Sequence, residues 1–132
     1  MKVEVSTGEL VDKVTILEIK LERITDPRKL DNVRREYDLL TEALAGAGIA
    51  RESAEFRELK GINVELWEIE DRIRVKERSG EFDAEFVQLA RSVYLANDRR
   101  SEAKRRINLA TGSSLIEEKQ HVDYRRRPGG DS

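Results

Sequence analysis

The sequence has 132 residues, which is enough for one domain with a modest hydrophobic core. Hydrophobic residues make up 38% of the chain and charged residues 39%, a composition typical of long helices with solvated faces. The net charge of -2 points to neither nucleic acid nor membrane, and the absence of cysteine excludes disulfides and thiolate metal sites. Since the sequence shows no apolar secretory or membrane-spanning segment, we expect a cytoplasmic protein.

The first two predicted helices are short and follow a brief extended segment. Residues 1–5 alternate in polarity, as in a strand or an extended lead-in. Ser6 as N-cap and Glu9 three residues later form the pattern of a capping box, which predicts a helix from there to about Ile24. A second helix is predicted from Pro27, whose missing N–H costs nothing at the first helical position, to the glycines of the stretch AGAG.

Two longer helices are predicted over residues 53–79 and 83–110, joined by the short connection RSGEFD. Because the connection is short, the two helices should form an antiparallel hairpin. At about 1.5 Å per residue each would be about 40 Å long, against about 28 Å for the first two, so part of the hairpin should stay uncovered. Gly61 is a weak point where the third helix could break near its start.

Apolar residues recur at spacings of three and four in all these segments, without the alternation of strands. The prediction is therefore an all-α protein: a four-helix antiparallel bundle with a long hairpin of helices three and four. A short N-terminal extended segment and a small C-terminal appendage complete it. Residues 1–124 would form this single helical domain, and residues 125–132 a disordered polar tail.

The core-facing stripe of the fourth helix turns polar in its middle. Burying cations and amides there without partners would cost several kcal/mol, so carboxylates and amides of other helices should gather around them. Two interpretations stay open: a structural ion-pair network, and a pocket for a small anion with Arg100 and Lys104 as donors. The predicted interior cluster consists of Glu18, Asn63, Glu70, Asn97, Arg100 and Lys104.

A second apolar strip of the third helix lies away from its core stripe. It consists of Val64, Trp67 and Val75. A helix with two apolar faces usually has two neighbours, and the second neighbour is here either another copy of the chain or the C-terminal appendage. Homodimerisation through the long hairpin is therefore one hypothesis, with Trp67 as a natural anchor.

Three carboxylates of the third helix follow one another at spacings of three: Glu65, Glu68 and Asp71. Such a run could hold magnesium, and it is similar in one respect to the E-x-x-E and E-x-x-D pairs of all-α nucleoside triphosphate pyrophosphohydrolases. That family takes its pairs from two helices, whereas both pairs overlap on one helix here. The simpler interpretation is a set of i,i+4 ion pairs, such as Glu68 with Arg72, so no metal is predicted at this site.

The basic residues of the fourth helix could contact phosphates. Acidic residues interrupt the group, however, and it lacks interleaved aromatic residues on which bases could stack. We therefore expect a solvated helix face rather than a nucleic-acid surface. The group comprises Arg99, Arg100, Lys104, Arg105 and Arg106.

Several segments resemble a family of small bacterial all-helical proteins of unknown function. They are GELVDKVTILEIKLERI, LDNVRREY, ELWEIEDRIR, LARSVYLANDRRSEAKRRIN and LIEEK. The resemblance extends from Gly8 to about Lys119. It implies a single intracellular helical domain and transfers no catalytic residue.

The sequence thus favours a non-catalytic helical interaction module that self-associates or docks to a protein partner, without a cofactor. The alternative is a binder, or a magnesium-dependent hydrolase, of a phosphorylated small molecule such as a nucleotide or a sugar phosphate. The two hypotheses differ in where substitutions should matter: at Trp67 for assembly, and at Arg100 for ligand binding.

Overall fold

A computed structural model describes residues 1–120 and 122–123 of the chain. This part contains helices and no strand, which confirms the all-α prediction. The predicted tail at 125–132 lies outside the described residues. The helices are α1 (Thr7–Arg23), α2 (Pro27–Ala45), α3 (Ala54–Ser79) and α4 (Ala84–Thr111).

Each helix begins at a side chain that caps its first turn. The caps are Ser6, Asp26, Ser53 and Asp83, whose side-chain oxygens each accept a backbone N–H of the first turn. The two long helices end at glycines in the left-handed conformation, Gly80 and Gly112. The break considered at Gly61 is absent, because α3 runs through this residue without interruption and buries Leu59 and Ile62 on either side of it.

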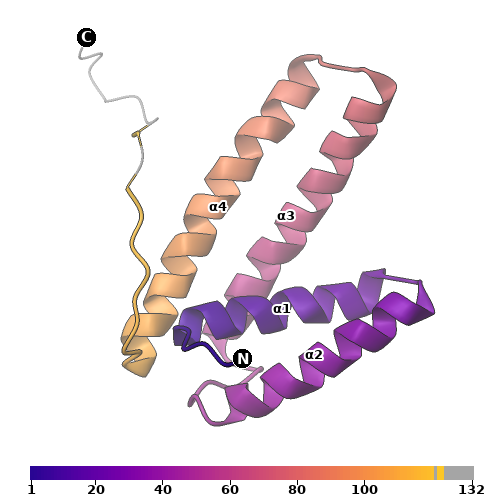
Figure 1. Ribbon diagram of the computed structural model, residues 1–132. Coiled ribbons are helices and arrows are strands. Elements are labelled where there is room, and N and C mark those ends of the chain that lie inside the picture. Colours follow the sequence, from indigo (N-terminus) through magenta and orange to yellow (C-terminus); the bar gives the residue numbers. More distant parts are fainter. Residues whose placement is uncertain (121, 124–132) are drawn as a thin grey trace.

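The four helices form two hairpins that cross each other (Figure 1). α3 and α4 lie side by side and antiparallel, α1 crosses them towards one end, and α2 packs against α1. The other end of the long hairpin extends beyond the α1–α2 pair, as the unequal helix lengths predict. We call residues 70–95, which form this end, the projecting arm.

The hydrophobic core lies at the crossing. α1 lies between α2 and the long hairpin and is therefore buried on two sides, with Val11 and Val14 fully inaccessible. All four helices contribute to the core, which consists of Val11, Val14, Leu44, Phe56, Leu59, Ile62, Leu66, Ala96, Ala103 and Ile107.

Residues 113–120 have no regular structure and lie along α4 (Figure 1). The Ser6 hydroxyl donates to the Glu117 carboxylate, and the N–H of Thr7 donates to Ser113 Oγ over 3.2 Å. The predicted C-terminal appendage therefore joins the start of α1 to the end of α4.

Candidate functional site

Asp12 is the centre of the polar network at the crossing. Its side chain is 2% exposed, and Arg100 of α4 donates to both of its carboxylate oxygens, with 2.9 Å between Nε and Oδ1. Asn63 of α3 donates through Nδ2 to Asp12 Oδ1 and to Thr15 Oγ1, both at 2.9 Å. The Thr15 hydroxyl donates in turn to the backbone carbonyl of Asp12 over 2.7 Å. One carboxylate thus joins α1, α3 and α4.

The pairing with Asp12 explains how Arg100 can lie on a core-facing stripe. Two parallel N–H···O bonds are the strongest arrangement open to a guanidinium and a carboxylate. The hydrogen bonds to Asp12 raise the pKa of Arg100, and the negative charges of Asp12, Glu9 and Glu70 add to this effect against the opposing effect of burial. Arg100 is therefore charged, and a buried carboxylate already neutralises it.

Lys104 also binds a carboxylate, at the start of α1. Its Nζ lies 2.6 Å from Glu9 Oε2, and the other oxygen of Glu9 lies 3.9 Å from Lys13. The predicted capping box is therefore only half formed. Ser6 Oγ accepts the N–H of Glu9 over 3.1 Å, whereas the Glu9 side chain turns to Lys104.

Gly8 makes this approach of α1 to α4 possible. Its N–H donates to Asn108 Oδ1 over 2.6 Å. A Cβ atom at Gly8 would lie 2.5 Å from the backbone oxygen of Lys104 and 2.9 Å from Asn108 Oδ1, so a larger residue would force the helices apart.

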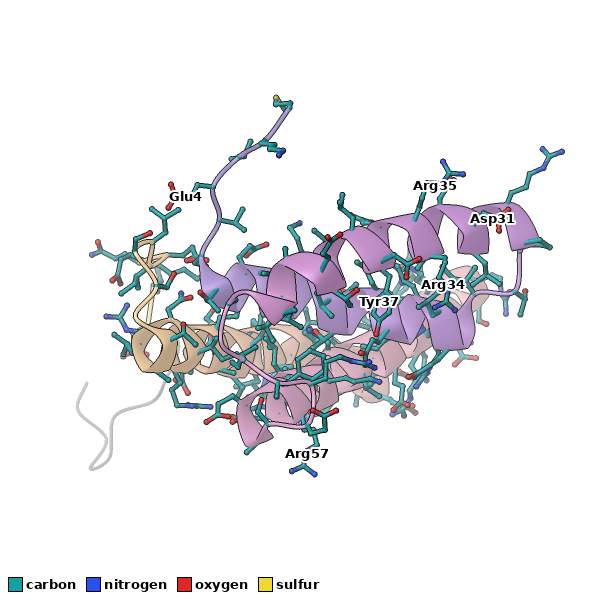
Figure 2. The ribbon with its side chains drawn as sticks, turned by 90° about the horizontal axis from the view of Figure 1, so that it is seen from below. Glu4, Asp31, Arg34, Arg35, Tyr37 and Arg57 are labelled. Carbon is teal, nitrogen blue, oxygen red and sulfur yellow. The ribbon has the colours of Figure 1, made fainter. Side chains whose placement is uncertain are left out.

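Glu18 forms a further cluster, beyond Asp12 along α1. The buried carboxylate accepts the Tyr37 hydroxyl at 2.9 Å, Lys60 Nζ at 2.9 Å and Arg51 Nε at 2.8 Å. Figure 2 shows Tyr37 on the inner side of α2, where it meets this cluster. Burial raises the pKa of Glu18, but the hydrogen bonds from Lys60 and Tyr37 and the charges of Lys60 and Arg51 outweigh it and lower the pKa overall. Burial and the bond to Glu18 raise the pKa of Tyr37.

The structure divides the predicted interior cluster. Asn63 and Arg100 do meet, at Asp12, whereas Glu18 and Lys104 belong to separate clusters farther along α1 on either side. Three salt-bridged clusters therefore follow α1 in place of one.

Glu70 and Asn97 take no part in these clusters. Glu70 is exposed and acts on Arg100 only through its charge, and Asn97 is half-buried. Among residues 1–120 and 122–123, no hydrogen bond to either side chain is found.

Glu9 and Asp12, the carboxylates of α1 that bind cations of α4, are absent from the predicted cluster. The signal for Asp12 is a second stripe on α1 at spacings of four and three, formed by Gly8, Asp12, Thr15 and Ile19, all of which are buried. A stripe of small and polar residues beside an apolar one indicates a helix that is buried on two sides.

Each basic residue predicted to lie on a solvated face of α4 has a carboxylate partner. These bonds hold α4 to α1, α3 and the C-terminal segment. The pairs are Arg99 with Glu65, Arg100 with Asp12, Lys104 with Glu9, Arg105 with Glu118, and Arg106 with Glu58.

The three weak metal candidates of α3 are exposed and pair with cations: Glu65 with Arg99, Glu68 with Arg23, and Asp71 with Arg74. The described residues contain no group of acidic side chains or histidines arranged to hold a metal ion. The predicted pair of Glu68 with Arg72 is wrong, because Arg72 reaches Glu85 across the hairpin at 3.0 Å.

The predicted apolar strip of α3 runs from the crossing into the projecting arm. Val64 and Trp67 are half-buried, and Val75 is 52% exposed. Further exposed apolar side chains of the arm are Phe82, Val87, Tyr94 and Leu95.

Two cavities flank the pair of Glu9 and Lys104. One, of about 300 Å³, is lined by Lys104, Asn108 and residues of the C-terminal segment. The other, of about 470 Å³, is lined by Glu9 and the same segment. Both volumes fall in the range of small-ligand sites.

The chain belongs to DUF6165, a family of unknown function, and the family model matches residues 1–128. This confirms the resemblance to a family without an assigned function. Searches of the curated proteins and of the solved structures found no match. In the described part of the chain, no helix is long and apolar enough to cross a membrane.

Proposed function

We propose, since the family assigns no activity, that this chain is a non-catalytic helical interaction module of the cytoplasm that self-associates or docks to a protein partner. The projecting arm is the observation that supports this proposal. It leaves the core at the crossing and exposes apolar side chains on both helices and on their connection, among them Val75, Val87 and Phe82. Exposed apolar side chains that join into one continuous patch are typical of binding sites for proteins.

The polar clusters support a structural role rather than a ligand site. Arg100 and Lys104 already bind Asp12 and Glu9, so an incoming anion would have to displace a protein carboxylate. Displacement from Arg100 would leave the Asp12 charge buried without its partner, at a cost of several kcal/mol.

The end of the arm is fixed in shape. Lys76 lies within 3.4 Å of the carboxylates of Glu81, Asp83 and Glu85, and the hydrogen bond to Asp83 raises the pKa of Lys76. Gly80 closes α3 in the left-handed conformation. A surface that is ordered before binding loses less conformational entropy when a partner docks.

The test is thermal melting at several protein concentrations together with sedimentation. For the wild type we expect a melting temperature that rises with protein concentration, because association stabilises the folded state. Trp67→Ala and Val75→Asp should remove this dependence while circular dichroism stays helical. A melting temperature that is constant with protein concentration but rises with a nucleotide or a sugar phosphate would contradict the proposal.

The cavity beside Lys104 favours a second candidate, a binder or magnesium-dependent hydrolase of a phosphorylated small molecule. Three basic side chains line it: Lys104, Arg105 and Lys119. Glu102, Glu117 and Glu118 line the same cavity and would repel a phosphate, so binding there would need a bridging cation such as magnesium. Stabilisation by the ligand only when magnesium is present would support this candidate.

A further inference from the structure

We infer that the partner of the projecting arm is a second copy of this chain, packed antiparallel along α3. The inference rests on the proposed function, because it names the partner of the same surface.

The charges of α3 divide along the helix. Residues 65–71 include four acidic residues and no basic one, whereas residues 72–78 include four basic residues and one acidic residue. Two antiparallel copies would place the acidic half of one helix against the basic half of the other. A parallel arrangement would oppose like charges, so the pattern selects the antiparallel one.

The side of α3 that faces away from α4 is available for this contact. Glu65 and Arg72 mark the other side, since they pair with Arg99 and Glu85 of α4. We define the outer stripe as the five residues Trp67, Glu68, Asp71, Arg74 and Val75, which recur at spacings of three and four.

The charged groups of the outer stripe can exchange their partners. The side chains of Glu68, Asp71 and Arg74 are each more than half exposed. Arg74 lies 4.0 Å from Asp71, and Glu68 lies 3.2 Å from Arg23. Exposed pairs of this kind contribute little to stability, so replacing them by contacts with another chain costs little.

An antiparallel register centred on Asp71 matches the outer stripe with itself. Trp67 of one copy then lies opposite the second copy's Val75, and Glu68 lies opposite the second copy's Arg74. Each contact occurs twice, as twofold symmetry requires. The two Asp71 carboxylates meet near the axis, and the Arg74 of each copy would be shared between its own Asp71, now 4.0 Å away, and the second copy's Glu68.

The shape of the chain suits this arrangement. The outer stripe begins in the angle between the two hairpins, where Arg23 at the end of α1 contacts Glu68. The α1–α2 pair extends past α3 on one side of this angle and the arm extends on the other (Figure 1). The arm of each copy can therefore lie in the angle of the other.

The test uses two opposite charge reversals, Glu68→Arg and Arg74→Glu. In a homodimer of either variant, two cations or two carboxylates face each other at both symmetric positions. We expect each variant alone to dimerise at least about tenfold more weakly than the wild type. In an equimolar mixture both positions pair a cation with a carboxylate, so dimers with one copy of each variant should form. Sedimentation with one variant labelled measures both results.

A matched control reverses a charge at a position away from the outer stripe. Arg35 points outward from α2 in Figure 2, so Arg35→Glu should dimerise like the wild type. Circular dichroism of all variants should show unchanged helix content, because the substituted side chains are exposed.

Two outcomes would overturn the inference, and they have different consequences for the proposed function. If both reversals alone dimerise like the wild type, the copies associate through another surface and self-association stands. If the wild type is monomeric at every concentration, no second copy binds, and the proposed function then requires a different protein partner.

Discussion

The crossing of the hairpins and the projecting arm use the same charged residue types in opposite ways. At the crossing, Asp12 and Arg100 form a pair enclosed by α1, α3 and α4, and every buried side-chain polar atom of the described residues has a hydrogen-bond partner. In the arm, the pair of Arg72 with Glu85 is open to water. Because breaking a buried pair leaves a charge without a partner, the crossing fixes one arrangement of the helices. This exposed pair remains free to exchange its partners.

The largest effect is expected at Asp12. Asp12→Ala leaves the Arg100 guanidinium partly buried without its carboxylate and removes an acceptor of Asn63. We expect a loss of about 3–5 kcal/mol in the free energy of unfolding, measured by urea denaturation.

A double substitution separates the effect of removing the charge pair from the effect of leaving one of its charges buried alone. Replacing both partners by apolar residues, as in Asp12→Leu with Arg100→Met, removes both charges together, so most of the lost stability should return. A single Arg100→Met should be clearly destabilising, because the Asp12 carboxylate then stays buried alone. If the single and the double variant lose the same stability, packing rather than charge governs this position.

Gly8→Ala should give the next largest effect. The new Cβ would meet the backbone oxygen of Lys104, which cannot move without shifting α4. We expect a loss of about 1–3 kcal/mol by urea denaturation. Gly61→Ala is the matched control in the same assay. Nothing lies within 4 Å of a Cβ there, so it should stabilise α3 by about 0.5–1 kcal/mol.

Acid should weaken the Glu18 cluster at the crossing. The pKa of Glu18 is lowered in the folded chain, so its contribution is complete above the unfolded-state pKa of about 4.3 and is lost as the pH falls through the folded value. Glu18→Gln has no such titration. The melting temperature of the wild type should therefore fall more steeply below about pH 5 than that of the variant. Parallel pH profiles would show that Glu18 contributes nothing to acid sensitivity.

The smallest effect is expected in the arm. Arg72→Ala removes one exposed pair with Glu85 and should change the free energy of unfolding by less than about 1 kcal/mol. Added salt should reduce the difference further, since it screens charges at the surface. A loss comparable to that of Asp12→Ala would abolish the distinction between the two regions.

Spacing and capping residues were enough to predict the helices and the long hairpin. Ser6 and Pro27 are local signals, and the apolar periodicity of a helix shows which side is buried. Periodicity does not fix the angle at which two hairpins cross, and this angle decides which side chains meet. The polar stripe of α4 thus predicted a carboxylate partner for Arg100, but its identity as Asp12 depends on the crossing.

The same limit explains the ion pairs of α3. In the sequence, Glu68 and Arg72 are neighbours on one helix, and no pattern indicates a different ion-pair partner for either of them. In the fold, the end of α1 brings Arg23 to Glu68, and α4 brings Glu85 to Arg72. Contacts between different helices therefore replaced a pair within one helix.

The close approach at Gly8 also constrains the order in which the chain can fold during synthesis. The first turn of α1 donates to Asn108, a hundred residues later, and to Ser113 beyond it. When α1 leaves the ribosome, Lys104 and Arg100, which pair with Glu9 and Asp12 in the fold, have not yet been made, and these carboxylates stay hydrated. The contacts within the α3–α4 hairpin are closer in sequence than those between α1 and α4. The hairpin can therefore form first, and the start of α1 can pack against it afterwards. A nascent chain that stalls before α4 can therefore form the contacts of α1 with α2 and α3, but it lacks the residues that bind the first turn of α1.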